Sequence, residues 1–240
     1  MIRRLHTSRI SPGSVQLGDA EAHHARDVLR LGVGDEVELF DHAGVTAPGR
    51  ISRCDKKTVL VEVASTSKIA NAPAFAVASA IPKGERADWM IEKLSELGVS
   101  RLVPLTTARS VVHPSGKSKF DRWTRIAIES AKQSRRIGIM KIEPLTKLEA
   151  ALSRSMTGVF LSTEPLAPPI VNIQHSTLID PYFLFVGPEG GWTDAEQVSM
   201  KRIGLTPARL TATILRVETA AVAAAAVVAC LFAAQSKAPA

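Results

Sequence analysis

The chain of 240 residues carries a net charge of +7, with 45% of its residues hydrophobic and 22% charged. This composition is that of an ordinary soluble globular protein, and the length allows one large domain or two small ones. The basic charge favours an acidic partner such as nucleic acid, because lysines and arginines that replace phosphate counterions gain entropy from ion release. Cys54 and Cys230 lie far apart without CxxC spacing, which argues against a zinc site or a disulfide framework and fits a reduced cytoplasm.

The first part of the chain, up to about residue 67, has the pattern of short β-strands joined by turns. Residues 36–40 and 58–63 alternate polar and apolar side chains, which is typical of half-buried strands. A short helix is expected over residues 20–31. We therefore predict a small β-barrel, followed by a linker at residues 68–73.

Farther along the chain, apolar strands alternate with helical segments, which predicts a parallel sheet with helices on both faces. The expected strands are residues 75–81, 101–105, 158–161, 182–186 and 208–210. The expected helices are residues 86–97, 118–136, 145–153, 193–203 and 218–234.

The last of these helices contains an apolar run at residues 220–234. The run is shorter than the roughly 20 residues of a membrane-spanning helix, and alanine dominates it. We expect a buried helix, packed closely against a neighbouring helix or a second subunit, and no membrane segment.

The segment FVGPEGGWTDAE places three glycines, a proline and a carboxylate between a strand and a helix. The strand at residues 182–186 is continuously apolar, as in a buried strand of a parallel sheet. Thr193, with Glu196 three residues later, forms a capping box that begins a helix. The loop at residues 187–191 therefore follows the carboxyl end of a strand, where open α/β folds bind ligands.

The residues of this loop limit what it can bind. No lysine follows the glycines as in a phosphate-binding loop, Glu189 would repel phosphate, and the GxGxxG pattern of dinucleotide sites is absent. A tight turn explains Gly190 and Gly191 but leaves Pro188 and Glu189 unexplained. S-adenosylmethionine is compatible with the loop, because it carries positive charges and ribose hydroxyls and no phosphate, and glycines let the backbone approach it closely.

A second polar loop lies in the segment LTATILRVETA, which begins at Leu210. A strand ends near Leu210, a short loop carries Arg216 and Glu218, and the alanine-rich helix follows. The two charged residues could form a local ion pair, with the carboxylate in the favourable first turn of the helix. Alternatively, two polar loops at neighbouring strand ends form a shared pocket.

The helix expected at residues 118–136 has two distinct faces. One carries Trp123 and its apolar neighbours, and the other carries basic side chains. The basic face is either a solvated surface or a stripe that contacts RNA phosphates. Its members are Arg122, Arg125, Lys132 and Arg136.

The segments GPEGGW and ILRVETA together resemble the RsmE family of SPOUT methyltransferases, which methylate N3 of a uridine in bacterial 16S ribosomal RNA. The resemblance extends over nearly the whole chain. The chain departs from the family pattern at Thr211 and Thr213, where the family usually has glycine and arginine, and at Arg135, which replaces the glycine of QSGR. The motifs in chain order are His23-His24, Val28-Leu29-Arg30, Gly34-Asp35, Lys83-Gly84, Glu92-Lys93, Glu96-Leu97-Gly98-Val99, Pro104-Leu105, Arg109-Ser110 and Gln133-Ser134.

The resemblance implies an α/β plus β fold with two domains. Residues 1–70 would form a PUA-like small β-barrel that helps to grip RNA. Residues 74–240 would form a SPOUT α/β domain with a parallel sheet and a deep trefoil knot. It further implies a cytoplasmic homodimer, joined through the C-terminal domain, that uses S-adenosylmethionine, requires no metal and acts on 16S rRNA of the small ribosomal subunit.

The same resemblance, with the reasoning above, assigns roles to residues. Arg216 and Arg136 would stabilise a uracil anion, and Glu189 or Glu218 would orient groups or accept its proton. Trp192 could stack on a base or anchor the next helix. The expected cofactor-binding residues are Leu161, Ser162, Thr163, Val186, Gly187, Pro188, Glu189, Gly190, Gly191, Leu210, Thr211, Ile214, Leu215 and Thr219. The expected RNA-binding residues are His24, Arg30, Lys83, Arg109, Arg122, Arg125, Lys132 and Arg136.

Two other functions remain open at this point. One is a SPOUT RNA methyltransferase that acts on a ribose 2′-OH or on another base. The other is a non-catalytic RNA-binding protein of ribosome assembly that retains the fold, an alternative that Thr211 and Thr213 keep open.

Overall fold

The computed structural model describes residues 2–68, 75–154, 156–173, 178 and 181–235. The chain forms two compact units. The N-terminal unit comprises Met1–Ala72 and, from much later in the chain, Ile128–Ile139. The C-terminal unit comprises Pro73–Ala127 and Met140–Ala240. Apart from Lys68, the predicted linker lies outside the described residues.

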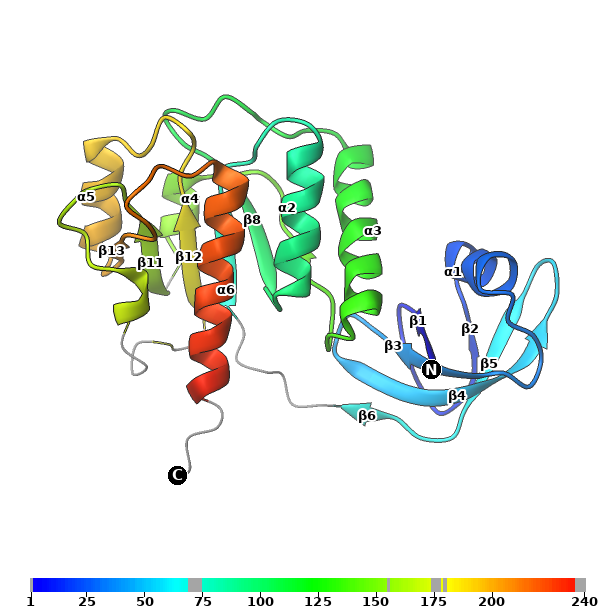
Figure 1. Cartoon of the computed structure of the whole chain (residues 1–240). Coiled ribbons are helices and arrows are strands. Elements are labelled where there is room, and N and C mark those ends of the chain that lie inside the picture. The colour runs from blue at the N-terminus through cyan, green and yellow to red at the C-terminus, as the bar shows by residue number, and fades with distance from the viewer. Residues whose placement is uncertain (1, 69–74, 155, 174–177, 179–180, 236–240) are drawn as a thin grey trace. The chain divides into compact units, whose positions relative to one another are not determined.

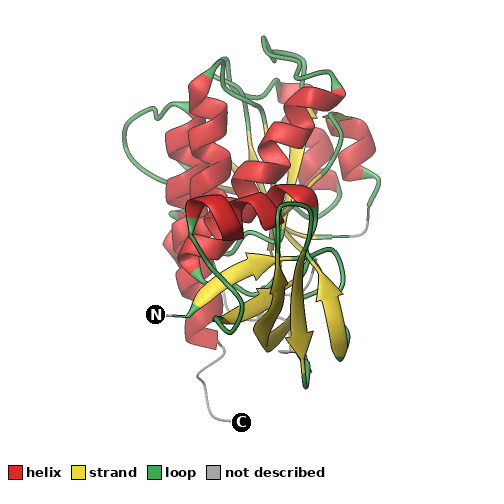
Figure 2. Ribbon diagram, turned by 90° about the vertical axis from the view of Figure 1, so that its right-hand side faces the viewer, coloured by secondary structure: helices red, strands yellow, loops and turns green. Residues whose placement is uncertain are grey.

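The N-terminal unit is built on a six-stranded sheet of order β1-β3-β4-β5-β2, with β6 paired to β4. The strands, yellow at the lower front of Figure 2, are antiparallel except for the parallel pair β1 and β3. The predicted strands at residues 36–40 and 58–63 are confirmed as β3 and β5. The bounds are β1 Arg3–His6, β2 Gly13–Gln16, β3 Glu36–Phe40, β4 Val45–Cys54, β5 Val59–Val63 and β6 Ser67–Lys68.

The single helix predicted at residues 20–31 is wrong in its form and its end. The structure has the α-helix α1 (Asp19–His23), followed directly by the π-helical turn η1 (His24–Val28). Arg30 has a φ of 56°, a left-handed conformation that cannot continue a right-handed helix. The helical stretch therefore stops before Arg30.

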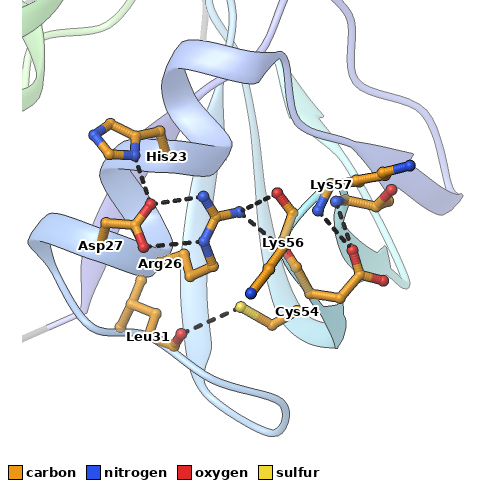
Figure 3. A network of polar contacts seen from close by, with 9 residues as sticks. His23, Arg26, Asp27, Leu31, Cys54, Lys56 and Lys57 are labelled. Carbon is orange, nitrogen blue, oxygen red and sulfur yellow. Dashed lines mark hydrogen bonds and ion pairs between the residues drawn. The ribbon is translucent and has the colours of Figure 1, made fainter.

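Arg26 fastens η1 to the turn between β4 and β5 (Figure 3). Its guanidinium bonds the carboxylate of Asp27 and donates to the main-chain oxygens of Asp55, at 2.9 Å, and Lys56, at 3.2 Å. Hydrogen bonding from Arg26 holds the pKa of Asp27 below its ordinary value. The Cys54 thiol donates to the main-chain oxygen of Leu31, a few residues after η1. This network fixes a short helical segment that has little stability of its own.

The C-terminal unit contains a seven-stranded parallel sheet of order β10-β8-β7-β12-β11-β13, with β9 paired to β8. Strand β12 lies between β7 and β11, and all its residues are buried, so the predicted buried parallel strand is confirmed. The bounds are β7 Phe75–Ser79, β8 Arg101–Thr106, β9 Lys141–Ile142, β10 Thr146–Lys147, β11 Thr157–Leu161, β12 Tyr182–Val186 and β13 Thr206–Ala208.

The last strand was predicted at residues 208–210, but the structure places it two residues earlier, as β13 (Thr206–Ala208). Thr206 pairs with Val159, and Ala208 with Leu161. Pro207 lies within the strand, which is tolerated because β13 is at the sheet edge, where an N–H can be absent from one side. Residues beyond Ala208 instead enter a loop.

Helices cover both faces of the sheet (Figures 1 and 2). Phe183 and Phe185 join the apolar cluster that includes residues of α4 and α5. Tyr182, one position away along β12, meets Phe232 of α6, which also packs beside α2. Because successive side chains of a strand point to opposite faces of the sheet, α4 and α5 cover one face, and α2 and α6 cover the other. The helix bounds are α2 Glu85–Glu96, α3 Lys117–Ser134, α4 Leu148–Leu152, α5 Asp194–Arg202 and α6 Val217–Gln235.

Helix α6 buries one side and leaves the other partly open. The buried stripe packs into the C-terminal unit through Val217, Ala221, Ala224, Ala225, Val228 and Phe232. The opposite stripe is also apolar and half-buried or exposed; it includes Val222, Ala223, Ala226, Val227, Cys230 and Leu231. The window Val217–Ala234 is long and apolar enough to cross a membrane, with a mean hydropathy of 2.1. The buried stripe against the sheet and α2 is the packing expected of a core helix.

Candidate functional site

Three loops at the carboxyl edge of the parallel sheet enclose a cavity of about 550 Å³. They are residues 161–165 after β11, residues 186–192 at the end of β12 and beyond, and residues 209–215 after β13. These strands are neighbours in the order β12-β11-β13. Parallel strands end at one edge, so their following loops meet there. The structure thus brings together the two polar loops singled out in the sequence.

Trp192 anchors the glycine loop from inside. Its side chain is buried, and its indole N–H donates a 2.8 Å hydrogen bond to the main-chain oxygen of Leu161. A Cβ at Gly187 would lie 2.9 Å from the Trp192 ring, closer than real side chains approach. Of the two roles left open for Trp192, the structure favours the anchor over base stacking.

The predicted capping box at the start of α5 is confirmed. The Thr193 hydroxyl accepts from the main-chain N–H of Glu196, and the Glu196 carboxylate accepts from the main-chain N–H of Thr193. This box satisfies N–H groups that the first turn leaves without helical partners. The glycine loop therefore ends at a fixed helix start.

The third loop is held at two points. The guanidinium of Arg209 donates a 3.1 Å hydrogen bond to the main-chain oxygen of Pro165, in the loop after β11. The hydroxyl of Thr211 donates to the main-chain oxygen of Thr213 at 2.7 Å. The departure at Thr211 from the family's usual glycine thus supplies an internal hydrogen bond to the loop.

Thirteen of the fourteen predicted cofactor-binding residues line this cavity, and Thr219 does not. Thr219 is exposed on the outer side of α6. Lining residues that were not among those predictions are Arg109, Glu164, Pro165, Trp192, Gln197, Arg209, Ala212, Thr213, Val217 and Ala220. The sequence offered one sign that Arg109 belongs to the site, because it follows the end of a predicted strand. It could not indicate that the loop of Arg109 reaches the glycine loop.

The predicted catalytic residues have different environments. Glu189 lines the cavity and is exposed, and Arg216 is exposed between two lining residues, Leu215 and Val217. Glu218 is buried outside the lining, and its carboxylate lies 3.6 Å from the Arg86 guanidinium. The ion pair considered for Glu218 therefore has Arg86 as its partner.

The predicted catalytic residue Arg136 belongs to the N-terminal unit and does not line the cavity. Its side chain is half-buried, and this burial lowers its pKa from 12.5 to about 10. It remains a cation at neutral pH.

The predicted RNA-binding residues differ in their exposure and in whether an acidic side chain already pairs with them. Lys132 lies 2.6 Å from Glu21 and 2.8 Å from Glu129, and its side chain is 9% exposed. Arg122 forms an ion pair with Asp88 at 2.6 Å. Arg30, Lys83 and Arg125 are exposed, and His24 is half-buried. The buried face predicted for this helix is confirmed by Trp123, Ala127 and Ser130. Within the described ranges, no cluster of three or more histidine, cysteine or acidic side chains could hold a metal ion.

The cavity suits a ligand with charged groups and an apolar part. Glu164 and Glu189 are in its lining, as are apolar side chains such as Leu210 and Ile214. Arg109 and Arg209 also line it, and their guanidinium groups donate to main-chain oxygens of the surrounding loops. The glycines at positions 187, 190 and 191 expose main chain to the same space. A carboxylate attracts an ammonium or a sulfonium and repels phosphate, so these residues fit S-adenosylmethionine better than a nucleotide triphosphate.

Comparisons with known proteins agree with this arrangement. A family model described as "RNA methyltransferase domain" matches residues 70–229, and one described as "RNA methyltransferase PUA domain" matches residues 17–64. The chain is thus an RNA methyltransferase with a PUA-like N-terminal domain.

Individual relatives narrow the class. The chain is 32% identical to ribosomal RNA small subunit methyltransferase E of Synechocystis sp., covering 88% of this chain and 71% of the relative. It is 28% identical to the protein of that name in Bacillus subtilis, covering 83% of each. The chain belongs to the ribosomal RNA small subunit methyltransferase E family. A crystal structure of the Neisseria gonorrhoeae member, bound to S-adenosyl methionine, superposes with a TM-score of 0.84 at 27% identity, covering 94% of this chain and 96% of that one.

Proposed function

We propose that this protein transfers a methyl group from S-adenosylmethionine to N3 of a uridine in 16S rRNA of the small ribosomal subunit. The single observation that carries the proposal is the cavity of about 550 Å³ that the three loops form at the carboxyl edge of the sheet. The Neisseria relative with the same overall fold binds S-adenosyl methionine. When bound, this cofactor supplies a methyl group activated by the positive charge on sulfur.

The glycine loop and the loop at residues 209–215 would hold the cofactor. At Gly187 only glycine fits, because a side chain there would collide with the Trp192 ring. Glu189 offers a negative charge to the cofactor's cationic part. The indole of Trp192 keeps this loop attached to the one after β11. Such fixed geometry removes part of the entropic cost of aligning donor and acceptor.

The chain must also stabilise the uridine as it loses its N3 proton. Arg216 is exposed beside the cavity, so its guanidinium can pair with O2 or O4 as negative charge develops on the ring. Between the two candidate bases we favour Glu189, because Glu218 is buried against Arg86. The uridine would have to be unpaired or turned out of the RNA, since a paired base hides N3.

The remaining parts of the proposal concern domains and partners. Residues 1–70 would form a PUA-like β-barrel that grips RNA, and residues 74–240 a SPOUT domain with a deep trefoil knot. The open apolar stripe of α6 supports a homodimer through the C-terminal domain, because a second copy would cover it. A cytoplasmic enzyme would meet small subunits during their assembly.

Phosphate contacts would come from the exposed cations Arg30, Lys83 and Arg125. Lys132 contributes less to this surface, since Glu21 and Glu129 already neutralise it. Arg136 keeps the proposed role of a second cation for the uracil anion. These residues are proposed contacts, supported by the basic charge of the chain.

The proposal is tested by assaying wild-type protein and Arg216→Ala with purified small subunits. The wild type should transfer methyl groups, and the variant should be slower by about 10²-fold or more, the usual effect of removing a group that stabilises developing negative charge. Arg202→Ala, on the exposed end of α5, is the control and should keep full activity. Undiminished transfer by Arg216→Ala would remove Arg216 from the site. No saturable binding of the cofactor to the wild type would favour a non-catalytic RNA-binding protein.

A further inference from the structure

The loop that follows β8, residues 107–110, reaches the glycine loop although β7 separates β8 from β12 in the sheet. The loop is closed on itself. Ser110 donates its main-chain N–H to the oxygen of Thr107 at 3.2 Å, and the Ser110 hydroxyl oxygen accepts from the N–H of Thr107 at 3.0 Å. A loop closed in this way can act as a rigid support.

Glu196 joins this loop to the start of α5. One carboxylate oxygen accepts a 2.8 Å hydrogen bond from the main-chain N–H of Ala108. The other accepts from the N–H of Thr193 at 2.8 Å and is 3.0 Å from its hydroxyl. Glu196 is only 8% exposed. The capping carboxylate therefore serves two segments, and hydrogen bonds to a buried charge are stronger than those between neutral groups.

Arg109 extends from the same loop to the glycine loop. Its guanidinium donates a 2.7 Å hydrogen bond to the main-chain oxygen of Gly190. The N–H of Gly191, in the same peptide group, donates to the oxygen of Pro188 at 2.8 Å. One peptide group of the cavity wall is thus held at both its oxygen and its nitrogen.

The contact between Arg109 and Gly190 is also close. A Cβ added at Gly190 would lie 3.2 Å from the Cβ of Arg109, tighter than most real contacts. Glycine at this position lets the arginine stem lie against the main chain. Arg109 therefore contacts the loop both by packing and by charge-assisted hydrogen bonding.

We propose that Arg109 and Glu196 are positioning residues that hold the glycine loop in its cofactor-binding shape. This inference rests on the proposed function, because it assigns the cavity to S-adenosylmethionine. The inference changes the role predicted for Arg109 from the sequence. Its guanidinium holds the main chain of the cofactor loop instead of contacting RNA phosphates. The two roles predict different measurements.

The test measures cofactor affinity and RNA affinity separately. Arg109→Met keeps an unbranched apolar stem but removes the donors. We expect it to bind S-adenosylmethionine about tenfold or more weakly by calorimetry, the effect of losing a hydrogen bond from a charged group. Its affinity for 16S RNA and the salt dependence of that affinity should be unchanged. Arg109→Lys should recover part of the cofactor affinity, because its ammonium again offers a charged donor, although without the planar shape of the guanidinium.

Glu196→Gln is the second variant. Glutamine keeps one acceptor oxygen but turns an NH2 group toward a main-chain N–H, so cofactor affinity should again fall while RNA affinity holds. Arg202→Met, a matched exposed arginine of α5, should change neither. If Arg109→Met does not fold, the comparison of Arg109→Lys with wild type decides.

Two outcomes overturn the inference. Unchanged cofactor affinity in the Arg109 variants would do so, as would a loss of RNA affinity with a shallower salt dependence, the signature of a lost phosphate contact. Wild-type protein that fails to bind the cofactor would instead refute the proposed function itself, so the two failures are distinguishable.

Discussion

At the scale of single residues, Gly187 is the glycine of the cavity wall at which an added side chain would fit least well. A methyl group there would meet the Trp192 ring at 2.9 Å and force it to move. We predict that Gly187→Ala lowers the free energy of unfolding by about 1–3 kcal/mol, the usual effect of overpacking. It should also weaken cofactor binding, because Trp192 holds the neighbouring loop through Leu161. Chemical denaturation and calorimetry measure the two effects.

Gly32→Ala is the matched control for this substitution. A Cβ at Gly32 meets nothing within 4 Å, and its φ is not positive. It should leave stability and cofactor affinity close to those of the wild type. Equal behaviour of the two variants would show that the contact between Gly187 and Trp192 does not constrain the loop.

The residue scale also shows what the sequence could and could not predict. The capping box at Thr193 follows from local spacing, and this prediction agrees with the structure. The need for glycine at position 187 comes from the ring of Trp192, five residues later, which the sequence pattern does not reveal. Arg109 donates to Gly190, which lies 81 positions away, and no local pattern reports such a contact. Glu218 was ambiguous for the same reason, since its partner Arg86 is far along the chain.

At the scale of elements, the end of α3 carries an unfavourable conformation. Arg135 has a φ of 54°, a left-handed conformation that favours glycine, the residue of the family's QSGR motif. We predict that Arg135→Gly raises the free energy of unfolding by about 1 kcal/mol, since a side chain in this conformation costs roughly that much. Urea denaturation measures the change.

Gln133→Gly provides the opposite case two residues earlier. Gln133 is exposed in the last turn of α3, where glycine destabilises a helix by up to about 1 kcal/mol. The two glycine substitutions should therefore change stability in opposite directions. A loss of stability in both would contradict the strain assigned to Arg135.

Strand β1 contains a group that makes stability depend on pH. Burial lowers the pKa of His6 to about 4 from 6.5, and the nearby His42 and Lys132 act in the same direction. As the pH falls below 6.5 the unfolded chain takes up a proton at His6 and the folded protein does not, so stability decreases until about pH 4. The expected loss between pH 7 and pH 5 is about 2 kcal/mol, at roughly 1.4 kcal/mol per pKa unit.

His6→Gln isolates this contribution. The variant should lose less stability than the wild type between pH 7 and pH 5, measured by urea denaturation at each pH. Subtracting the pH dependence of one protein's stability from that of the other removes the contributions of the remaining titrating groups, which both proteins share. Parallel pH dependences would show that His6 is not kept neutral by the fold.

Elements with strong local signals were predictable from the sequence, and those set by pairing were not. Strands β3 and β12 have clear patterns, and their predicted bounds agree with the structure. Strand β13 was displaced because its bounds depend on pairing with β11 at the sheet edge. The π-helical turn η1 depends on Arg26 and a distant turn, which helical periodicity does not reveal.

At the scale of the whole molecule, α6 is the proposed subunit interface. Its open stripe is apolar at successive turns, with Val227 near the middle. We predict a dimer for the wild type and a monomer for Val227→Asp, because a buried charge without a partner opposes association. Sedimentation velocity at matched concentrations measures the state.

Val198→Asp is the control for this substitution. Val198 is 64% exposed on α5, outside the proposed interface, and its variant should remain dimeric. A monomeric wild type, or a dimer that survives Val227→Asp, would contradict the assignment of α6.

Two properties of the whole molecule lay outside sequence reasoning. Alternation of strands and helices predicted a parallel sheet, but it carries no information on the strand order, in which β12 lies between β7 and β11. The inclusion of Ile128–Ile139 in the N-terminal unit was also hidden, because the pattern of α3 is continuous across residue 127. Composition did indicate the acidic partner, through the net charge of +7.

Location of the methyl group tests the central claim most directly. Purified small subunits that lack the modification are incubated with the protein and isotopically labelled S-adenosylmethionine, and the 16S rRNA is digested and analysed by mass spectrometry. We predict labelled 3-methyluridine at one position, in an amount that approaches one per subunit. Label on a ribose 2′-OH or on another base, or no label in RNA despite cofactor binding, would contradict the account.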